Sequence, residues 1–175
     1  MSVDLSLDFF SLFGLPRRFR LDEEALGRAW HTLQNEAHPD RHAHLPDSRG
    51  AMQGALRVNE AYAALKKPAT RAQYLLELGG VSVDAIDGNT VAPEYLFEQL
   101  EWYEALEEAR AAKDIGALER LAARLQTQAG SVIEQMAEQI DDFRDLEKAA
   151  DTVRRLKFLD KLRLGIDSAL AALDN

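Results

Sequence analysis

The chain has 175 residues, enough for one domain or two small ones, and its 21 basic and 30 acidic side chains give a formal net charge of −9. It contains no cysteine, which excludes disulfides, a thiolate nucleophile, cysteine-bound zinc and an iron–sulfur cluster held by the chain's own sulfurs. The pI near 4.9 argues against general nucleic-acid binding, because a protein that neutralises phosphates needs a basic surface.

The first half of the chain predicts four helices. Alanine, leucine, glutamate, glutamine and arginine dominate, and strand signals are nearly absent. A short helix over residues 8–13 ends at Gly14. A second helix over 22–37 begins at Asp22 as its N-cap and ends before Pro39, and residues 38–47 then form a loop. Two more helices follow, over residues 48–67 and 69–78, and Gly79-Gly80 ends the last one.

The second half predicts three long helices, over residues 93–112, 114–142 and 146–173. Short joins between them favour an antiparallel bundle. The middle helix carries one apolar stripe, formed by Leu118, Leu121, Leu125, Val132, Met136, Ile140 and Phe143. We therefore expect an all-α protein with a domain over 1–80, a linker over 81–92, where periodicity is weak, and a three-helix bundle over 93–175.

Charge is distributed unevenly along the chain. Residues 76–120 carry a net charge of −8, whereas residues 1–75 carry +1 and residues 121–175 carry −2. Such a localised charge concerns association rather than fold. The N-terminus lacks the positive region of a signal peptide, and no apolar run approaches the length of a membrane span. We expect a cytoplasmic protein without membrane or nucleic-acid partners.

The tripeptide His38-Pro39-Asp40 lies between two amphipathic helices. Taken alone, it is equally well explained as a proline that ends a helix and an aspartate that starts a turn. If the two helices pair as an antiparallel hairpin, however, the proline holds the imidazole and the carboxylate at an exposed tip. A single imidazole and carboxylate without a pocket are unsuited to catalysis, so the pattern favours a recognition point.

A His-Pro-Asp loop between paired helices resembles the hallmark of J domains. Further stretches extend the likeness to the HscB family of iron–sulfur cluster co-chaperones, and together they cover essentially the whole chain. These stretches are residues 8–16, 59–62, 71–76 and 149–162. The resemblance implies an N-terminal J domain followed by a C-terminal three-helix bundle, in agreement with the helices predicted above.

The resemblance also implies a partner for the first domain. In this family the J domain docks on a dedicated chaperone ATPase, HscA, and stimulates its ATP hydrolysis through the positions that match His38, Pro39 and Asp40. We add Arg28, on the helix before the loop, and Arg41, directly after the motif, to the expected chaperone-binding residues. The basic face usual in J domains is reduced here to Arg28 and His31, which suits a dedicated partner.

The helix that begins at Pro93 is apolar over about 240° of its circumference, more than bundle packing requires. The arc around Trp102 and Tyr103 suffices for the bundle. The extra strip either packs on the first domain or binds a partner. The resemblance favours the second explanation and implies that the scaffold protein IscU binds there, with an exposed Phe158 from the last helix. The expected scaffold-binding residues are Leu96, Phe97, Leu100, Glu101, Glu104, Glu108 and Phe158.

Two other functions compete with the co-chaperone hypothesis. His38, Asp40, His42 and His44 could bind a metal and make the chain a small metal-dependent enzyme, although loop ligands so close together rarely complete a tetrahedral site. The chain could also be a helical interaction protein without chaperone coupling. No glycine-rich phosphate loop is present, so we expect neither ATP hydrolysis by this chain nor a cofactor of its own.

Overall fold

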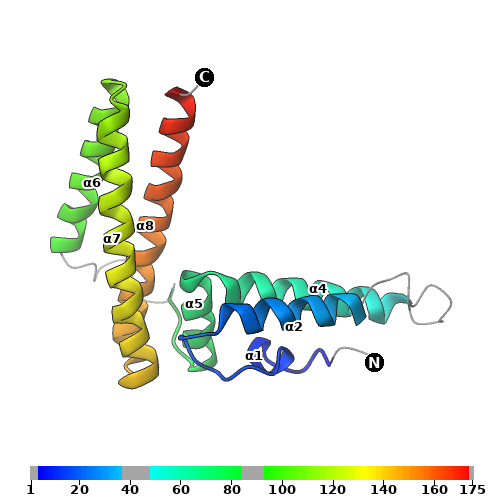
Figure 1. Ribbon diagram of the computed structural model, residues 1–175. Coiled ribbons are helices and arrows are strands. Elements are labelled where there is room, and N and C mark those ends of the chain that lie inside the picture. The colour runs from blue at the N-terminus through cyan, green and yellow to red at the C-terminus, as the bar shows by residue number, and fades with distance from the viewer. Residues whose placement is uncertain (1–3, 37–47, 84–92, 174–175) are drawn as a thin grey trace. The chain divides into compact units, whose positions relative to one another are not determined.

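The computed structural model describes residues 4–36, 48–83 and 93–173, and within these ranges it contains helices and no strand (Figure 1). The chain divides into two compact units, Met1–Gly79 and Gly80–Asn175. The prediction of an all-α protein is therefore confirmed. In the part of the chain that is described, no helix is both long and apolar enough to cross a membrane.

The first unit contains α1 (Phe9–Leu12), α2 (Glu23–Glu36), α4 (Ser48–Lys66) and α5 (Pro68–Leu78). Asp22 caps α2 as predicted, because its carboxylate accepts a hydrogen bond of 2.9 Å from the backbone N–H of Ala25. Helices α2 and α4 pack side by side as an antiparallel hairpin (Figure 1). The core of this unit is formed by Phe10, Phe19, Leu26, Val58, Ala61, Leu65 and Leu76.

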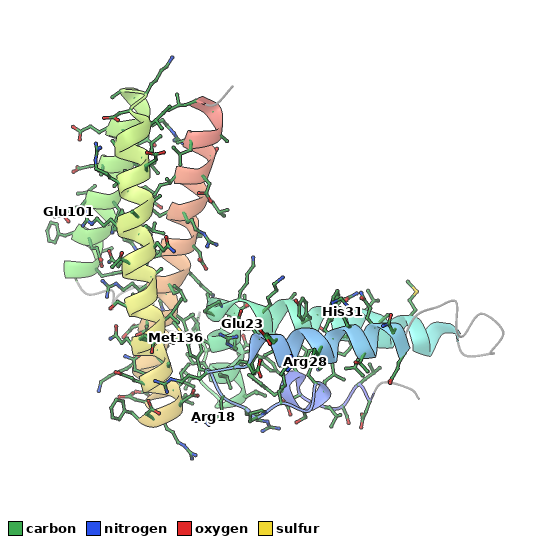
Figure 2. All side chains as sticks on the ribbon, viewed as in Figure 1. Arg18, Glu23, Arg28, His31, Glu101 and Met136 are labelled. Carbon is green, nitrogen blue, oxygen red and sulfur yellow. The ribbon has the colours of Figure 1, made fainter. Side chains whose placement is uncertain are left out.

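A buried arginine ties α5 to the hairpin. Arg71 is only 4% exposed, and its Nη1 donates a hydrogen bond of 3.0 Å to the carbonyl of Leu65 at the end of α4. The same nitrogen lies 3.8 Å from the carboxylate of Glu23. Figure 2 labels Glu23 at the start of α2. The guanidinium thus connects the end of α4 with the start of α2.

The second unit contains α6 (Pro93–Ala111), α7 (Ile115–Ala137), a π-helical turn η1 (Glu138–Asp142) and α8 (Leu146–Leu173). The three long helices pack on one another, which confirms the predicted bundle. Val83, which we had assigned to a linker, is buried in this unit, and its carbonyl accepts a hydrogen bond of 3.2 Å from Nε of Arg154. The core is formed by Trp102, Leu106, Leu118, Leu125, Val132, Met136, Val153, Leu159, Leu162 and Ile166.

The expectation that Phe143 completes the buried stripe of α7 is wrong. Its side chain is 73% exposed. The chain changes to a π-helical turn at Glu138, and the backbone N–H of Phe143 bonds to the carbonyl of Glu138, five residues back, at 2.9 Å. Because the turn holds an extra residue, it rotates the following positions, and Phe143 leaves the face that contains Met136 and Ile140.

Candidate functional site

The predicted chaperone-binding tripeptide lies outside the described residues. This holds for His38, Pro39, Asp40 and Arg41, and also for His42 and His44 of the alternative metal cluster. The structure describes the two helices that lead into and out of this segment. Of the predicted chaperone-binding residues, Arg28 alone falls within them, and it is exposed on α2 (Figure 2).

The hairpin of α2 and α4 is braced by Trp30. Its ring stacks on that of Tyr62 in α4, with ring centroids 4.6 Å apart, and its indole N–H donates a hydrogen bond of 3.1 Å to Oδ1 of Asn59. Leu26 on α2 and Leu65 on α4 are fully buried. Trp30 therefore packs within the hairpin, and these contacts hold together the two helices that precede and follow residues 37–47.

The exposed side of α2 is not strongly basic. The guanidinium of Arg28 lies 3.4 Å from the carboxylate of Glu24 and 4.0 Å from that of Asp22. All three side chains are exposed, so these ion pairs add little to stability. They do, however, offset part of the charge that Arg28 would present to an acidic partner. His31 is the remaining basic group on this side of the helix.

Helix α6 exposes a continuous apolar surface, which we call the α6 strip, formed by Leu96, Phe97, Leu100 and Tyr103. The exposed fractions of these side chains are 53%, 68%, 53% and 47%. Leu96, Leu100 and Tyr103 follow one another at spacings of four and three residues, so they form one row along the helix. Phe97 extends the row to one side. The predicted exposure of Leu96, Phe97 and Leu100 is confirmed.

The opposite side of α6 holds the helix in the bundle. Trp102, Leu106 and Ala109 are buried there. Near the strip, the carboxylate of Glu98 lies 2.9 Å from the guanidinium of Arg155 in α8 and also accepts a hydrogen bond from Gln128 in α7. One carboxylate therefore joins all three helices, and the strip rests on a fixed part of the fold.

Carboxylates border the strip on the side of Phe97. The side chains of Glu101, Glu104 and Glu108 are exposed, and none of them forms an ion pair with a described residue. Figure 2 labels Glu101 on the side of α6 away from α7 and α8. Glu107, in contrast, pairs with Arg110 at 2.9 Å. The strip thus combines apolar contact area with unneutralised negative charge, which suits a partner that carries apolar and cationic side chains.

The expected exposure of Phe158 is wrong. Its side chain is 7% exposed and lies under two tyrosines of α6. The centroid of the Phe158 ring lies 5.6 Å from that of Tyr103 and 6.1 Å from that of Tyr95, and both contacts are edge-to-face. The hydroxyl of Tyr95 donates a hydrogen bond of 3.3 Å to the carbonyl of Arg154, and burial raises the pKa of Tyr95. Phe158 is therefore part of the packing between α6 and α8.

Tyr103 is the surface residue that the sequence interpretation missed, because we had assigned it to the face that packs in the bundle. On a helical projection it lies only about 20° from Leu96, since a separation of seven residues nearly completes two turns. That spacing was the signal that could have placed it on the exposed row. Tyr103 is thus a second aromatic residue that faces solvent next to Leu100, besides Phe97.

The described residues offer no metal centre. No group of three or more histidine, aspartate or glutamate side chains within residues 4–36, 48–83 and 93–173 is arranged to hold a metal ion. The alternative cluster of His38, Asp40, His42 and His44 lies in the segment that the structure does not describe. The metal-dependent enzyme hypothesis therefore stays a prediction from the sequence.

Comparisons with known proteins agree along the whole chain. The family model described as the HSCB C-terminal oligomerisation domain matches residues 91–167. A protein named co-chaperone protein HscB homolog from Azoarcus sp. (strain BH72) is 57% identical over 100% of both chains. A protein of the same name from Aromatoleum aromaticum is 51% identical over 99% of each chain.

Two solved structures share the fold. Chaperone HscB from Vibrio cholerae is 33% identical to this chain and superposes with a TM-score of 0.85. The match includes 95% of this chain and 99% of the Vibrio cholerae chain. Human co-chaperone protein HscB is 23% identical and superposes with a TM-score of 0.87. The match includes 94% of this chain and 82% of the human chain. A fold with a J domain and a helical bundle is therefore common to these proteins and to this chain.

Proposed function

This chain belongs to the HscB co-chaperone family, and we propose that it serves iron–sulfur cluster assembly in the cytoplasm by delivering an IscU-type scaffold protein to an HscA-type chaperone ATPase. The second unit binds the scaffold through the α6 strip. The first unit engages the ATPase through His38, Pro39 and Asp40, with Arg28 and Arg41 beside them, and stimulates ATP hydrolysis.

The observation that carries this proposal is the α6 strip. Burial of Leu96, Phe97 and Leu100 in the bundle would favour folding, yet all three are exposed, so they contribute little to the stability of the chain alone. They lie on a helix whose other side is fixed by Trp102 and by the Glu98–Arg155 ion pair. A preformed apolar surface of this kind supports binding of a partner without a large cost in ordering.

The two units give the chain a tethering mechanism. A scaffold bound to the second unit is held near any chaperone bound to the first unit, which raises its effective concentration at the chaperone. The chain itself contributes no thiolate, because it has no cysteine, so cluster ligands of that kind come from the scaffold. The role of this chain is therefore recognition and stimulation, while ATP hydrolysis occurs on the chaperone.

Titration of the scaffold protein into the full-length chain tests the strip. Truncating Leu96 and Leu100 to alanine removes about 1 kcal/mol of apolar contact each, so the double variant should bind about 30-fold more weakly. Leu164→Ala is the matched control, because Leu164 is 65% exposed on α8. An unchanged affinity of the double variant would refute the assignment of the strip, as would equal losses for both variants.

The ATPase rate of the chaperone tests the first unit. The chain should raise this rate, the scaffold should raise it further, and His38→Gln should abolish the stimulation while leaving scaffold affinity unchanged. A chain that binds scaffold but never stimulates the ATPase would instead be a helical interaction protein. Stoichiometric metal retained by the purified chain and lost in His38→Gln would favour the metal-dependent enzyme.

A further inference from the structure

Tyr103 on α6 and Phe158 on α8 form an aromatic pair whose two members differ in exposure. Tyr103 is 47% exposed and covers Phe158, which is 7% exposed. We propose that Tyr103 contacts the scaffold protein with its ring, next to Phe97 of the same strip, and that Phe158 is a positioning residue that acts through Tyr103. This inference rests on the proposed scaffold binding at the α6 strip and extends it to residues that the sequence interpretation had assigned differently.

The position of Tyr103 supports a direct contact. It follows Leu100 by three residues and Leu96 by seven, so its ring continues the exposed row along α6. Its hydroxyl has no hydrogen-bond partner among the described residues. Tyrosine combines a large apolar ring with one polar group and has few torsions to fix, which makes it effective at the centre of interfaces.

The packing around Phe158 supports its indirect role. The Phe158 ring is held on one side by Tyr95, whose hydroxyl is bonded to the backbone of Arg154, and on the other side by Tyr103. The edge-to-face contact at 5.6 Å therefore fixes the Tyr103 ring from below. A ring that is already ordered loses less conformational freedom when it is bound.

The chemistry of the strip defines what the scaffold must offer. The Tyr103 ring and the two leucines need an apolar patch, and the Tyr103 hydroxyl needs a hydrogen-bond acceptor such as a backbone carbonyl. The carboxylates of Glu101 and Glu104, which form no ion pair with a described residue, need lysine or arginine side chains next to that patch. We therefore infer a scaffold surface that is apolar at its centre and basic along one border.

A double-mutant cycle tests the division of roles, with scaffold affinity measured by calorimetric titration of the full-length chain. Tyr103→Ala should weaken binding about tenfold, and Tyr103→Phe, which keeps the ring, should recover most of that loss. Phe158→Leu, which keeps the core filled, should weaken binding several-fold. In the Tyr103→Ala background the same Phe158→Leu change should have almost no further effect on affinity. Circular dichroism of each variant checks that the bundle remains folded.

Several outcomes would overturn the inference. If Phe158→Leu weakens binding equally with and without Tyr103, then Phe158 contacts the scaffold itself. If Tyr103→Ala binds like the unchanged chain while the Leu96→Ala, Leu100→Ala variant does not, then the strip binds the scaffold without Tyr103, and the proposed function stands alone. If the unchanged chain does not bind the scaffold, the proposed function fails, and the inference fails with it.

Discussion

Replacement of Asp8 should destabilise the first unit in a pH-dependent way. Its carboxylate accepts hydrogen bonds from the backbone N–H groups of Phe10 at 3.0 Å and Ser11 at 3.2 Å, and so caps α1. It also lies 2.7 Å from the guanidinium of Arg17. Burial raises the pKa of Asp8, but the hydrogen bonds from Arg17 and Ser11 outweigh it and lower that pKa to about 2.

The size of the effect follows from this pKa. A fall from 3.8 to about 2 corresponds to a ceiling of about 2.4 kcal/mol at 1.36 kcal/mol per unit. Because Arg17 is 61% exposed and its charge is screened by solvent, we expect about 1–2 kcal/mol for Asp8→Ala, including the lost cap. Asp8→Asn keeps a capping oxygen and loses the charge, so it should cost less.

The sign of the pH dependence is fixed by the lowered pKa. Because the folded-state pKa of Asp8 lies below its unfolded-state value, the charged carboxylate stabilises the fold fully above about pH 5, and this contribution is lost as the pH falls from about 4 to about 2. The difference between the unchanged chain and Asp8→Ala should therefore shrink in acid. The stability difference that remains in acid measures what the protonated Asp8 side chain still contributes as a helix cap.

Urea unfolding of the first unit measures this difference. The chain has two tryptophans, and Trp30 lies in the first unit while Trp102 lies in the second. A Trp102→Phe background therefore makes fluorescence a reporter of the first unit. The free energies of unfolding are compared at about pH 7, above the transition, and at about pH 2.5, where most of the electrostatic contribution is lost. A loss for Asp8→Ala that is the same at both pH values would refute the electrostatic reasoning.

Three further substitutions test the packing, with free energies of unfolding as the measurement. Gly130→Ala should stabilise the second unit by about 0.5–1 kcal/mol, because no atom beyond the adjoining helix backbone lies within 4 Å of the added Cβ. Gly165→Val should destabilise it by about 1–3 kcal/mol, because a Cβ there already meets Cδ2 of Leu106 at 3.1 Å. Asn59→Ala should cost the first unit about 0.5–1 kcal/mol, since water can replace the lost acceptor of Trp30.

The helices could be predicted from the sequence because their signals are local. Asp22 provides a cap within one turn, Pro68 lies at the first position of α5, and Gly80, just after that helix, adopts a φ of +79°. The π-helical turn has no such signal, because it depends on which carbonyl the backbone N–H of Phe143 reaches. A strict helical period therefore assigned Phe143 to the core, and the bonding over five residues removed it.

The candidate site could be predicted in part. An apolar arc too broad for bundle packing indicated the exposed Leu96 and Leu100, since this property belongs to one helix. The spacing from Leu96 could have placed Tyr103 on the exposed row, but the burial of Phe158 beneath it depends on how α6 and α8 pack, which no single-helix argument decides. The chaperone-binding tripeptide lies outside the described residues and stays a prediction from the sequence.

The exposed strip and the charge beside it are best understood together. The exposed α6 strip on every copy of the chain would favour association of two copies through their strips. The neighbouring carboxylates of Glu101 and Glu104 oppose this, because two copies meeting there would bring like charges together. A partner with basic side chains gains from the same carboxylates. The net charge of −8 within residues 76–120 therefore selects among partners, because it repels a second copy of this chain and attracts a partner with basic side chains.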